Sequence, residues 1–428
     1  MIDLIIAGTA GLFLGVIAGI LPGLGTGSLL GLLFIFLLNA PALTVIVFYI
    51  GILTSAQYFG SVTAILTGVP GDPAAIPTTK YGHAEAKNGF ASELIFLTAK
   101  YSLISGLLSF LLLLFLLHLG IYWTQSLSTI SQSFIFLIAI ILLITLSTEN
   151  PRTINWITAI IGLFIGAIGY SANFQTYFLV DASSPLRLGV PWLPVLTGLL
   201  VVPGLLSLKK LKINSRVTEK KKHTTKLGVV AARGGVIGFI LGTVPGLSYI
   251  LSSIVAAAVE SKISNNNTKV VVAAESANNA GAVSVLLPLL LLGIPITASE
   301  SIVFSILTAN ASISSLPNLI LDHWKIITFY FFIINCILFI AAWKFAVPLC
   351  RFLFSNTLIL FAFAVILSIG GVLWLGNFNH QLLTYIITLA VASAIGVIIK
   401  IDWSITIFAM LLYPHIEKHA YQILQLYF

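Results

Sequence analysis

Two stretches of polar side chains interrupt otherwise apolar sequence, and their residue types suit recognition of a carboxylate. Residues 55–83 carry hydroxyls and an amide before a proline-rich break, and residues 273–301 carry an acid and adjacent asparagines before another break. Neutral amides and hydroxyls can donate to a carboxylate without the cost of burying a fixed charge. We therefore predict substrate-binding positions at Gln57, Ser61, Gly71, Thr78, Thr79, Ser276, Asn278, Asn279, Gly293, Pro295 and Thr297. Hydrogen bonding between helices is the alternative role for the two asparagines.

Two acids in these stretches, Asp72 and Glu275, are the candidates for binding a coupling cation, Na⁺ or H⁺. Exposure to solvent in a loop is the alternative for both. The nearest basic residues are Lys80, Lys100 and Arg233. Each is interpreted as an interfacial side chain whose charged head reaches water, in preference to a substrate ligand.

A third polar element follows a Pro-Gly pair at residues 22–23, where Thr26 and Ser28 open a new apolar run. A Pro-Gly break at membrane depth ends one half-helix and leaves free N–H groups at the start of the next. Such groups favour a bound anion, so Thr26 and Ser28 join the predicted substrate-binding set. A tight hairpin at the membrane surface is the alternative.

The composition places these elements in a membrane. The chain of 428 residues is 58% hydrophobic and 8% charged, whereas soluble proteins carry roughly 25% charged residues. Apolar runs recur along the whole chain and predict about ten to twelve crossings of about 20 residues each. The fold class expected is an all-α polytopic membrane protein with discontinuous or re-entrant helices. The N-terminal run is interpreted as a retained segment because it lacks a basic n-region.

The net charge of +8 comes largely from one interval. Residues 209–226 hold eight of the 21 lysines and arginines, which indicates a cytoplasmic linker and argues against nucleic-acid binding. The two cysteines lack metal-site spacing, so neither a disulfide nor a metal site is predicted, and no cofactor is expected.

An internal repeat divides the chain. "GVIAGILPG" at residue 15 recurs as "GFILGTVPG" at residue 238, "SAQYFGSV" at 55 as "SANNAGAV" at 276, and "GVP" at 68 as "GIP" at 293. We predict a first transmembrane repeat at 1–207, a linker at 208–226 and a second repeat at 227–428, with the two repeats favoured to be inverted. Paired interrupted segments of this kind indicate a secondary transporter with a midplane site.

Other function classes fit less well. No HExxH, GxSxG or paired His/Asp cluster occurs, so an enzyme is not expected. A channel or a lipid-carrier translocase could use the same re-entrant motifs and is kept as the alternative function.

The strings "GILPGLG", "YFGSVTAILTGVPGDPAAIPTTKYGHAEAKNG" and "AAESANNAGAVSVLLPLLLLGIP" resemble the large membrane subunit of the tripartite tricarboxylate transporter family. The resemblance implies import of a citrate-like or other organic anion across the inner or plasma membrane, driven by an ion gradient. It also implies a periplasmic solute-binding protein and a small membrane subunit as partners, and a homodimer stays open. The sequence departs from the family pattern at Asp72, Lys80, Ser248 and Ala274, so a tricarboxylate is not assumed over a dicarboxylate.

Overall fold

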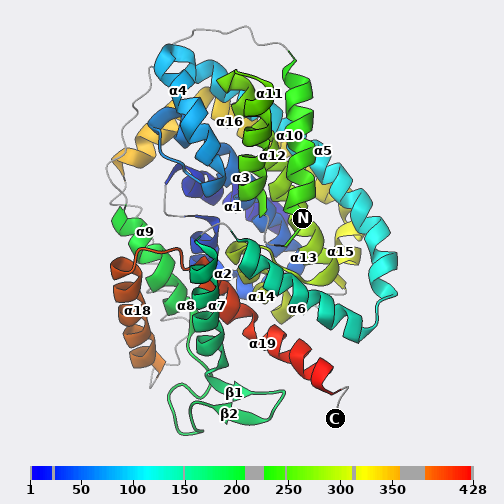
Figure 1. Ribbon diagram of the computed structural model, residues 1–428, viewed down its shortest axis with the longest axis vertical. Coiled ribbons are helices and arrows are strands. Elements are labelled where there is room, and N and C mark those ends of the chain that lie inside the picture. The colour runs from blue at the N-terminus through cyan, green and yellow to red at the C-terminus, as the bar shows by residue number, and fades with distance from the viewer. Residues whose placement is uncertain are drawn as a thin grey trace.

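A computed structural model describes residues 2–21, 25–147, 150–207, 226–245, 248–310, 315–356 and 381–425 (Figure 1). Most of the predicted linker lies outside these residues, as do Pro22, Gly23 and Gly246 of the Pro-Gly pairs. The described chain is largely helical, and its two strands form a single antiparallel hairpin. This confirms the predicted all-α class.

The part before the linker contains a set of long helices, a run of short turns and the hairpin. Its main elements are α1 (Ile2–Ile20), α2 (Thr26–Leu38), α3 (Ala42–Thr67), α5 (Ala91–Gln125), α6 (Thr129–Leu146), α7 (Arg152–Ala167), β1 (Gly169–Ser171) and β2 (Thr176–Phe178). The short elements are η1 (Pro73–Ala75), η2 (Thr78–Gly82), α4 (His83–Glu85), η3 (Ala86–Phe90), α8 (Trp192–Leu196), η4 (Thr197–Val201) and α9 (Val202–Ser207).

The part after the linker also consists of long and short helices. Its elements are α10 (Leu227–Gly242), α11 (Ser248–Ile263), α12 (Asn267–Ser284), α13 (Leu286–Leu292), α14 (Ala298–Asn310), α15 (Leu316–Asp322), α16 (Trp324–Ser355), α18 (Gln381–Ile398) and α19 (Ser404–Leu424). Six described helical segments are long and apolar enough to cross a membrane, and five shorter apolar helices accompany them. Several predicted crossings are therefore helices of 10–17 residues, shorter than the spans of about 20 residues expected from sequence.

The two central helices are α3 and α12. Every residue of α3 from Val45 to Thr67 is buried, and so is every residue of α12 from Val270 to Ser284. Outer helices such as α5, α7, α16 and α18 instead expose large apolar side chains, among them Phe115 and Phe329. An apolar outer surface of helices is the arrangement a bilayer requires.

Glycines let α1 approach α3 closely and let α10 approach α12 closely, and the two sets of contacts correspond. A Cβ at Gly15 of α1 would lie 2.3 Å from the carbonyl oxygen of Ile52, and one at Gly238 of α10 would lie 2.2 Å from that of Ala277. The pairs Gly11 with Phe48 and Gly234 with Ala273 repeat this geometry, at 2.3 and 2.2 Å. Small residues at this spacing allow backbone-to-backbone packing.

The end of α3 resembles the end of α13, the short helix that directly follows α12. Gly68 after α3 and Gly293 after α13 both adopt left-handed backbone conformations, with φ of 76° and 65°. The two glycines lie 225 residues apart in the sequence. The same offset separates Ile52 from Ala277. The strings "SAQYFGSV" and "SANNAGAV" are separated by 221 residues, four fewer than this offset. Four residues are about one helical turn, so the matching positions still lie on the same face of the helix.

Candidate functional site

Four helices begin at the wall of one cavity of about 330 Å³, named here the junction cavity. Its wall includes residues of α2, α14 and α19, and in Figure 1 α2, α14 and the start of α19 lie near the middle of the molecule. The residues contributed by helix starts are Gly25 to Ser28 of α2, Tyr249 and Ile250 of α11, Thr297 to Ser299 around the start of α14, and Trp403 and Ser404 of α19. Gly71 and Asp72 complete the wall near α2.

The charge of the junction cavity comes from helix ends and two acids. None of its lining residues is a lysine or arginine, and Asp72 and Asp402 are the acidic ones. The start of α2 has no side-chain cap, because its N-cap residue is Gly25. Its first N–H groups therefore lack intrahelical partners and, with the helix dipole, favour a bound anion. At α19, by contrast, Asp402 accepts from the Ser404 backbone N–H at 2.8 Å.

Behind the cavity a carboxylate cluster joins α3, η2 and α12. Glu275 of α12, which is fully buried, accepts hydrogen bonds from the hydroxyls of Ser61 and Thr78 and, at 3.4 Å, from the Asn278 amide. Both carboxylate oxygens thus have donors. No lysine, arginine or histidine forms an ion pair with Glu275 in the part of the chain that the structure describes.

The cavity and the carboxylate cluster meet at the loop after α3. Gly71 packs so closely on α1 that a Cβ there would lie 1.9 Å from the Gly19 carbonyl oxygen, and Gly60 of α3 faces Asp72. The loop therefore folds back along α3 toward the middle of the molecule. Asp72 lies close enough to Glu275 for their charges to interact.

Asp72 itself is a buried acid outside the six candidate spans. Burial raises its pKa from 3.8 to about 6, although its carboxylate accepts from the Ala74 backbone N–H at 2.9 Å. Asp72 can therefore exchange a proton near neutral pH at the wall of the cavity.

Several buried polar atoms beside the carboxylate cluster have no hydrogen-bond partner among the described residues. They are both amide atoms of Gln57, the Ser276 hydroxyl and the Asn278 carbonyl oxygen. Gln57 lies one turn from Ser61, and the other two follow Glu275 on α12. Buried polar groups are nearly always paired, so each of these atoms needs a partner such as a ligand, an ion or an ordered water.

The structure divides the predicted site residues into groups. Thr26, Ser28, Gly71 and Thr297 line the junction cavity with Asp72. Gln57, Ser61, Thr78, Ser276 and Asn278 lie with Glu275 in or beside the carboxylate cluster. Asn279 instead donates to Ser102 of α5 at 2.7 Å, Thr79 bonds the Ala75 carbonyl at 3.1 Å, and Gly293 and Pro295 form the turn before α14.

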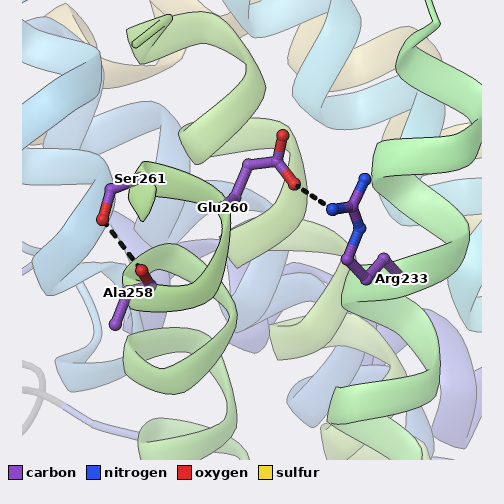
Figure 2. Close-up of polar contacts among 4 residues, drawn as sticks. All are labelled: Arg233, Ala258, Glu260 and Ser261. Atoms are coloured by element: carbon purple, nitrogen blue, oxygen red, sulfur yellow. Dashed lines mark hydrogen bonds and ion pairs between the residues drawn. The ribbon is translucent and has the colours of Figure 1, made fainter. Parts of the chain in front are cut away.

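The basic residues considered from sequence are engaged elsewhere. Arg233 of α10 lies 3.5 Å from the carboxylate of Glu260 on α11, which is 1% exposed (Figure 2). Lys80 and Lys100 lie over the rings of the adjacent Tyr81 and Tyr101, at 5.0 and 5.5 Å from the ring centroids. None of the three lysine or arginine side chains lines the junction cavity.

Sequence reasoning missed Tyr49, Glu300 and Asp402. Glu300 is fully buried, and its Oε2 accepts from the backbone N–H groups of Ile296 and Thr297 at 2.6 and 3.1 Å. Thr297 in turn accepts from the Glu300 backbone N–H at 3.3 Å. The signal that could have found Glu300 is the capping-box pattern Thr-x-x-Glu at the start of α14.

Comparison with known proteins now adds the family. The model of the tripartite tricarboxylate transporter TctA family matches residues 5–409. The chain belongs to this family. Its long apolar helices agree with a multi-pass membrane protein of a transporter family.

A curated relative of this TctA family member is the "Uncharacterized 52.8 kDa protein in TAR-I ttuC' 3'region" of Agrobacterium vitis. It is 26% identical over 301 residues, which cover 67% of this chain and 60% of the relative. The chain thus matches less than two thirds of that relative's length. No solved structure matches this TctA family member.

Proposed function

We propose that this chain is an ion-coupled secondary transporter that imports a small di- or tricarboxylate. The observation that carries the proposal is the junction cavity, where four helix starts converge without a lysine or arginine in the wall. The uncapped N–H groups of α2 and the helix dipoles favour a carboxylate there, whereas N–H groups at the starts of α14 and α19 already donate to Glu300 and Asp402. A site without fixed cations binds the anion while letting it leave again, as transport requires.

The proposed site extends from the cavity to the carboxylate cluster. Thr26, Ser28, Gly71 and Thr297 lie at the cavity, and Gln57, Ser276 and Asn278 offer polar atoms that have no partner among the described residues. A substrate with two or three carboxylates needs donors at separated points, which these two groups supply. Ser61, Thr78, Thr79, Asn279, Gly293 and Pro295 stay in the proposed set as the groups that hold the binding loops.

The proposed ion coupling rests on the balance of charges in the site. Asp72, Glu275 and Glu300 are buried acids, and none has an ion-pair partner among the residues the structure describes. An anionic substrate arriving beside ionised acids is repelled unless a cation or proton neutralises them. We propose Asp72 and Glu275 as coupling residues, with Na⁺ or H⁺ as the ion.

The architecture and partners are proposed on separate grounds. The matched glycine contacts and helix ends support two repeats at 1–207 and 227–428 joined by a cytoplasmic linker. Family membership supports a periplasmic binding protein and a small membrane subunit as partners in a bacterial or archaeal inner membrane.

Uptake into liposomes tests the proposal. Purified protein should accumulate a labelled dicarboxylate or tricarboxylate only under an imposed Na⁺ or proton gradient. Uptake without a gradient would favour a channel, and retention of lipid headgroups in place of carboxylates would favour a lipid-carrier translocase.

A charge-only substitution tests the location. Gly25 lines the cavity, and a Cβ there would meet nothing within 4 Å. Asp and Asn are equally good N-cap residues, so Gly25→Asn controls for size and capping in Gly25→Asp. The Asp variant should bind carboxylates at least about tenfold more weakly than the Asn variant, because a like charge faces the anion. Equal affinities would place the substrate elsewhere.

A further inference from the structure

Four side-chain oxygens of the described chain gather behind the junction cavity at Glu300. The Tyr49 hydroxyl of α3 lies within interaction range of Glu300, Thr297 and Ser299. Neither the Tyr49 hydroxyl nor Glu300 Oε1 completes a hydrogen bond of normal geometry with any described residue. Tyr49 is 1% exposed and Glu300 is fully buried, so bulk solvent does not reach these two oxygens.

Capping of α14 uses only one of the two carboxylate oxygens of Glu300. Oε2 accepts from the N–H groups of Ile296 and Thr297, but Oε1 has no donor. The two buried acids proposed as coupling residues differ. Both oxygens of Glu275 have donors, and Asp72 caps Ala74 at the cavity wall. A buried ionised carboxylate oxygen without a donor is costly unless a proton or a bound cation neutralises the charge.

We propose that Glu300, Tyr49, Thr297 and Ser299 form a Na⁺ site, which deepens the proposed function and rests on it for its role in coupling. Oxygen ligands alone suit a hard cation. One carboxylate with three neutral hydroxyls balances a single positive charge, whereas Ca²⁺ sites draw on more oxygen ligands, often several carboxylates. Tyr49, Ser299 and Glu300 are at most 4% exposed, so the site is tightly enclosed on their side, which favours Na⁺ over the larger K⁺.

The site shares a wall with the junction cavity. Thr297 and Ser299 line that cavity. Gly27 of α2 faces Ser299, since a Cβ added at Gly27 would lie 3.6 Å from the backbone nitrogen of Ser299. A cation that enters the cavity therefore has only the first turn of α14 between it and Glu300. Na⁺ there neutralises a negative charge beside the anion, so each ligand raises the affinity for the other. Such coupling is reciprocal and typically 5- to 150-fold.

Binding of Na⁺ alone, without any carboxylate, tests the site. Purified protein in detergent is titrated with NaCl against KCl at constant ionic strength, and the apparent melting temperature and ²²Na⁺ binding are measured. The wild type should be stabilised by Na⁺ and not by K⁺, and Glu300→Gln should lose both readouts. Tyr49→Phe removes only a hydroxyl and should raise the half-maximal Na⁺ concentration, which covers the case in which Glu300→Gln does not fold.

A matched control removes a different buried carboxylate. Glu260→Gln acts on the Arg233 pair of α10 and α11, outside the cavity, and should keep the Na⁺ response (Figure 2). A full Na⁺ response in folded Glu300→Gln, or equal stabilisation by Na⁺ and K⁺, overturns the site. If Na⁺ binds at Glu300 but no carboxylate is transported, the site stands and the proposed function fails. If carboxylate uptake follows a proton gradient and ignores Na⁺, the proposed function stands and the site fails.

Discussion

Ser61 of α3 donates a hydrogen bond to Glu275 of α12, and both residues are buried between the two central helices. The bond joins positions 214 residues apart, one before the linker and one after it. It therefore links the part of the chain before the linker directly to the part after it. A hydrogen bond to a buried charged group contributes more than a neutral one, because the charge has lost its water.

Removing this hydroxyl should destabilise the protein. Ser61→Ala leaves Glu275 one donor short, and we expect a loss of about 1.5–3 kcal/mol in unfolding free energy. Ser55→Ala is the matched control, since Ser55 lies on the same helix and its hydroxyl bonds only the Gly51 carbonyl of that helix, at 2.8 Å. The apparent melting temperature in detergent should fall clearly more for Ser61→Ala. Equal shifts would mean that the interhelical bond adds nothing.

The glycine contacts predict a second, sharper difference. Gly238→Ala places a methyl 2.2 Å from the Ala277 carbonyl oxygen, so α10 and α12 must separate, at about 1–3 kcal/mol or more. Gly228→Ala, on the same helix, meets nothing within 4 Å and should be neutral or stabilising. Gly15→Ala should match Gly238→Ala, because its methyl would lie 2.3 Å from Ile52 oxygen. Thermal stability and the monodisperse yield after solubilisation measure all three.

Sequence reasoning succeeded where a local pattern has one physical cause. The fold class followed from hydropathy, because long apolar runs predict membrane-spanning helices. Ser61 and Thr78 were predicted to bind substrate and Glu275 to bind the coupling cation, and no sequence pattern showed that the two hydroxyls would donate to that acid. Asp402 was missed because its position in the cavity depends on how α19 returns to α2, and spacing along the chain carries no such information. The same holds for the meeting of Tyr49 with Glu300.

The raised pKa of Asp72 predicts a pH-dependent stability. Its pKa is 3.8 in the unfolded chain and about 6 when folded, so the folded protein binds the proton more tightly. Ionising Asp72 therefore costs stability as the pH rises from about 4 to about 6, up to about 3 kcal/mol, and the loss stays constant above that.

Asp72→Asn should remove this loss. The Asn carbonyl can still accept from the Ala74 N–H, so the cap at η1 is kept. The variant should melt above the wild type at pH 7.5 and together with it near pH 4. Asp72→Ala loses the cap and should melt below Asp72→Asn at both values. A constant gap between Asp72→Asn and wild type across this range would show that Asp72 keeps an ordinary pKa.

The adjacent asparagines of α12 should separate in function, because the structure gives them different partners. Asn279 donates to Ser102 of α5 at 2.7 Å and to the Glu275 carbonyl at 3.0 Å, so Asn279→Ala should lower stability by about 1–3 kcal/mol. Asn278 makes a longer bond of 3.4 Å to Glu275 and leaves its carbonyl oxygen without a partner among the described residues. Asn278→Ala should therefore change the melting temperature little and weaken carboxylate uptake strongly. Ser102→Ala supplies the control, because it should reproduce the stability loss of Asn279→Ala and leave uptake by the folded fraction intact. If Asn278→Ala transports normally and Asn279→Ala does not, the roles are reversed, and the substrate lies on the α5 side of α12.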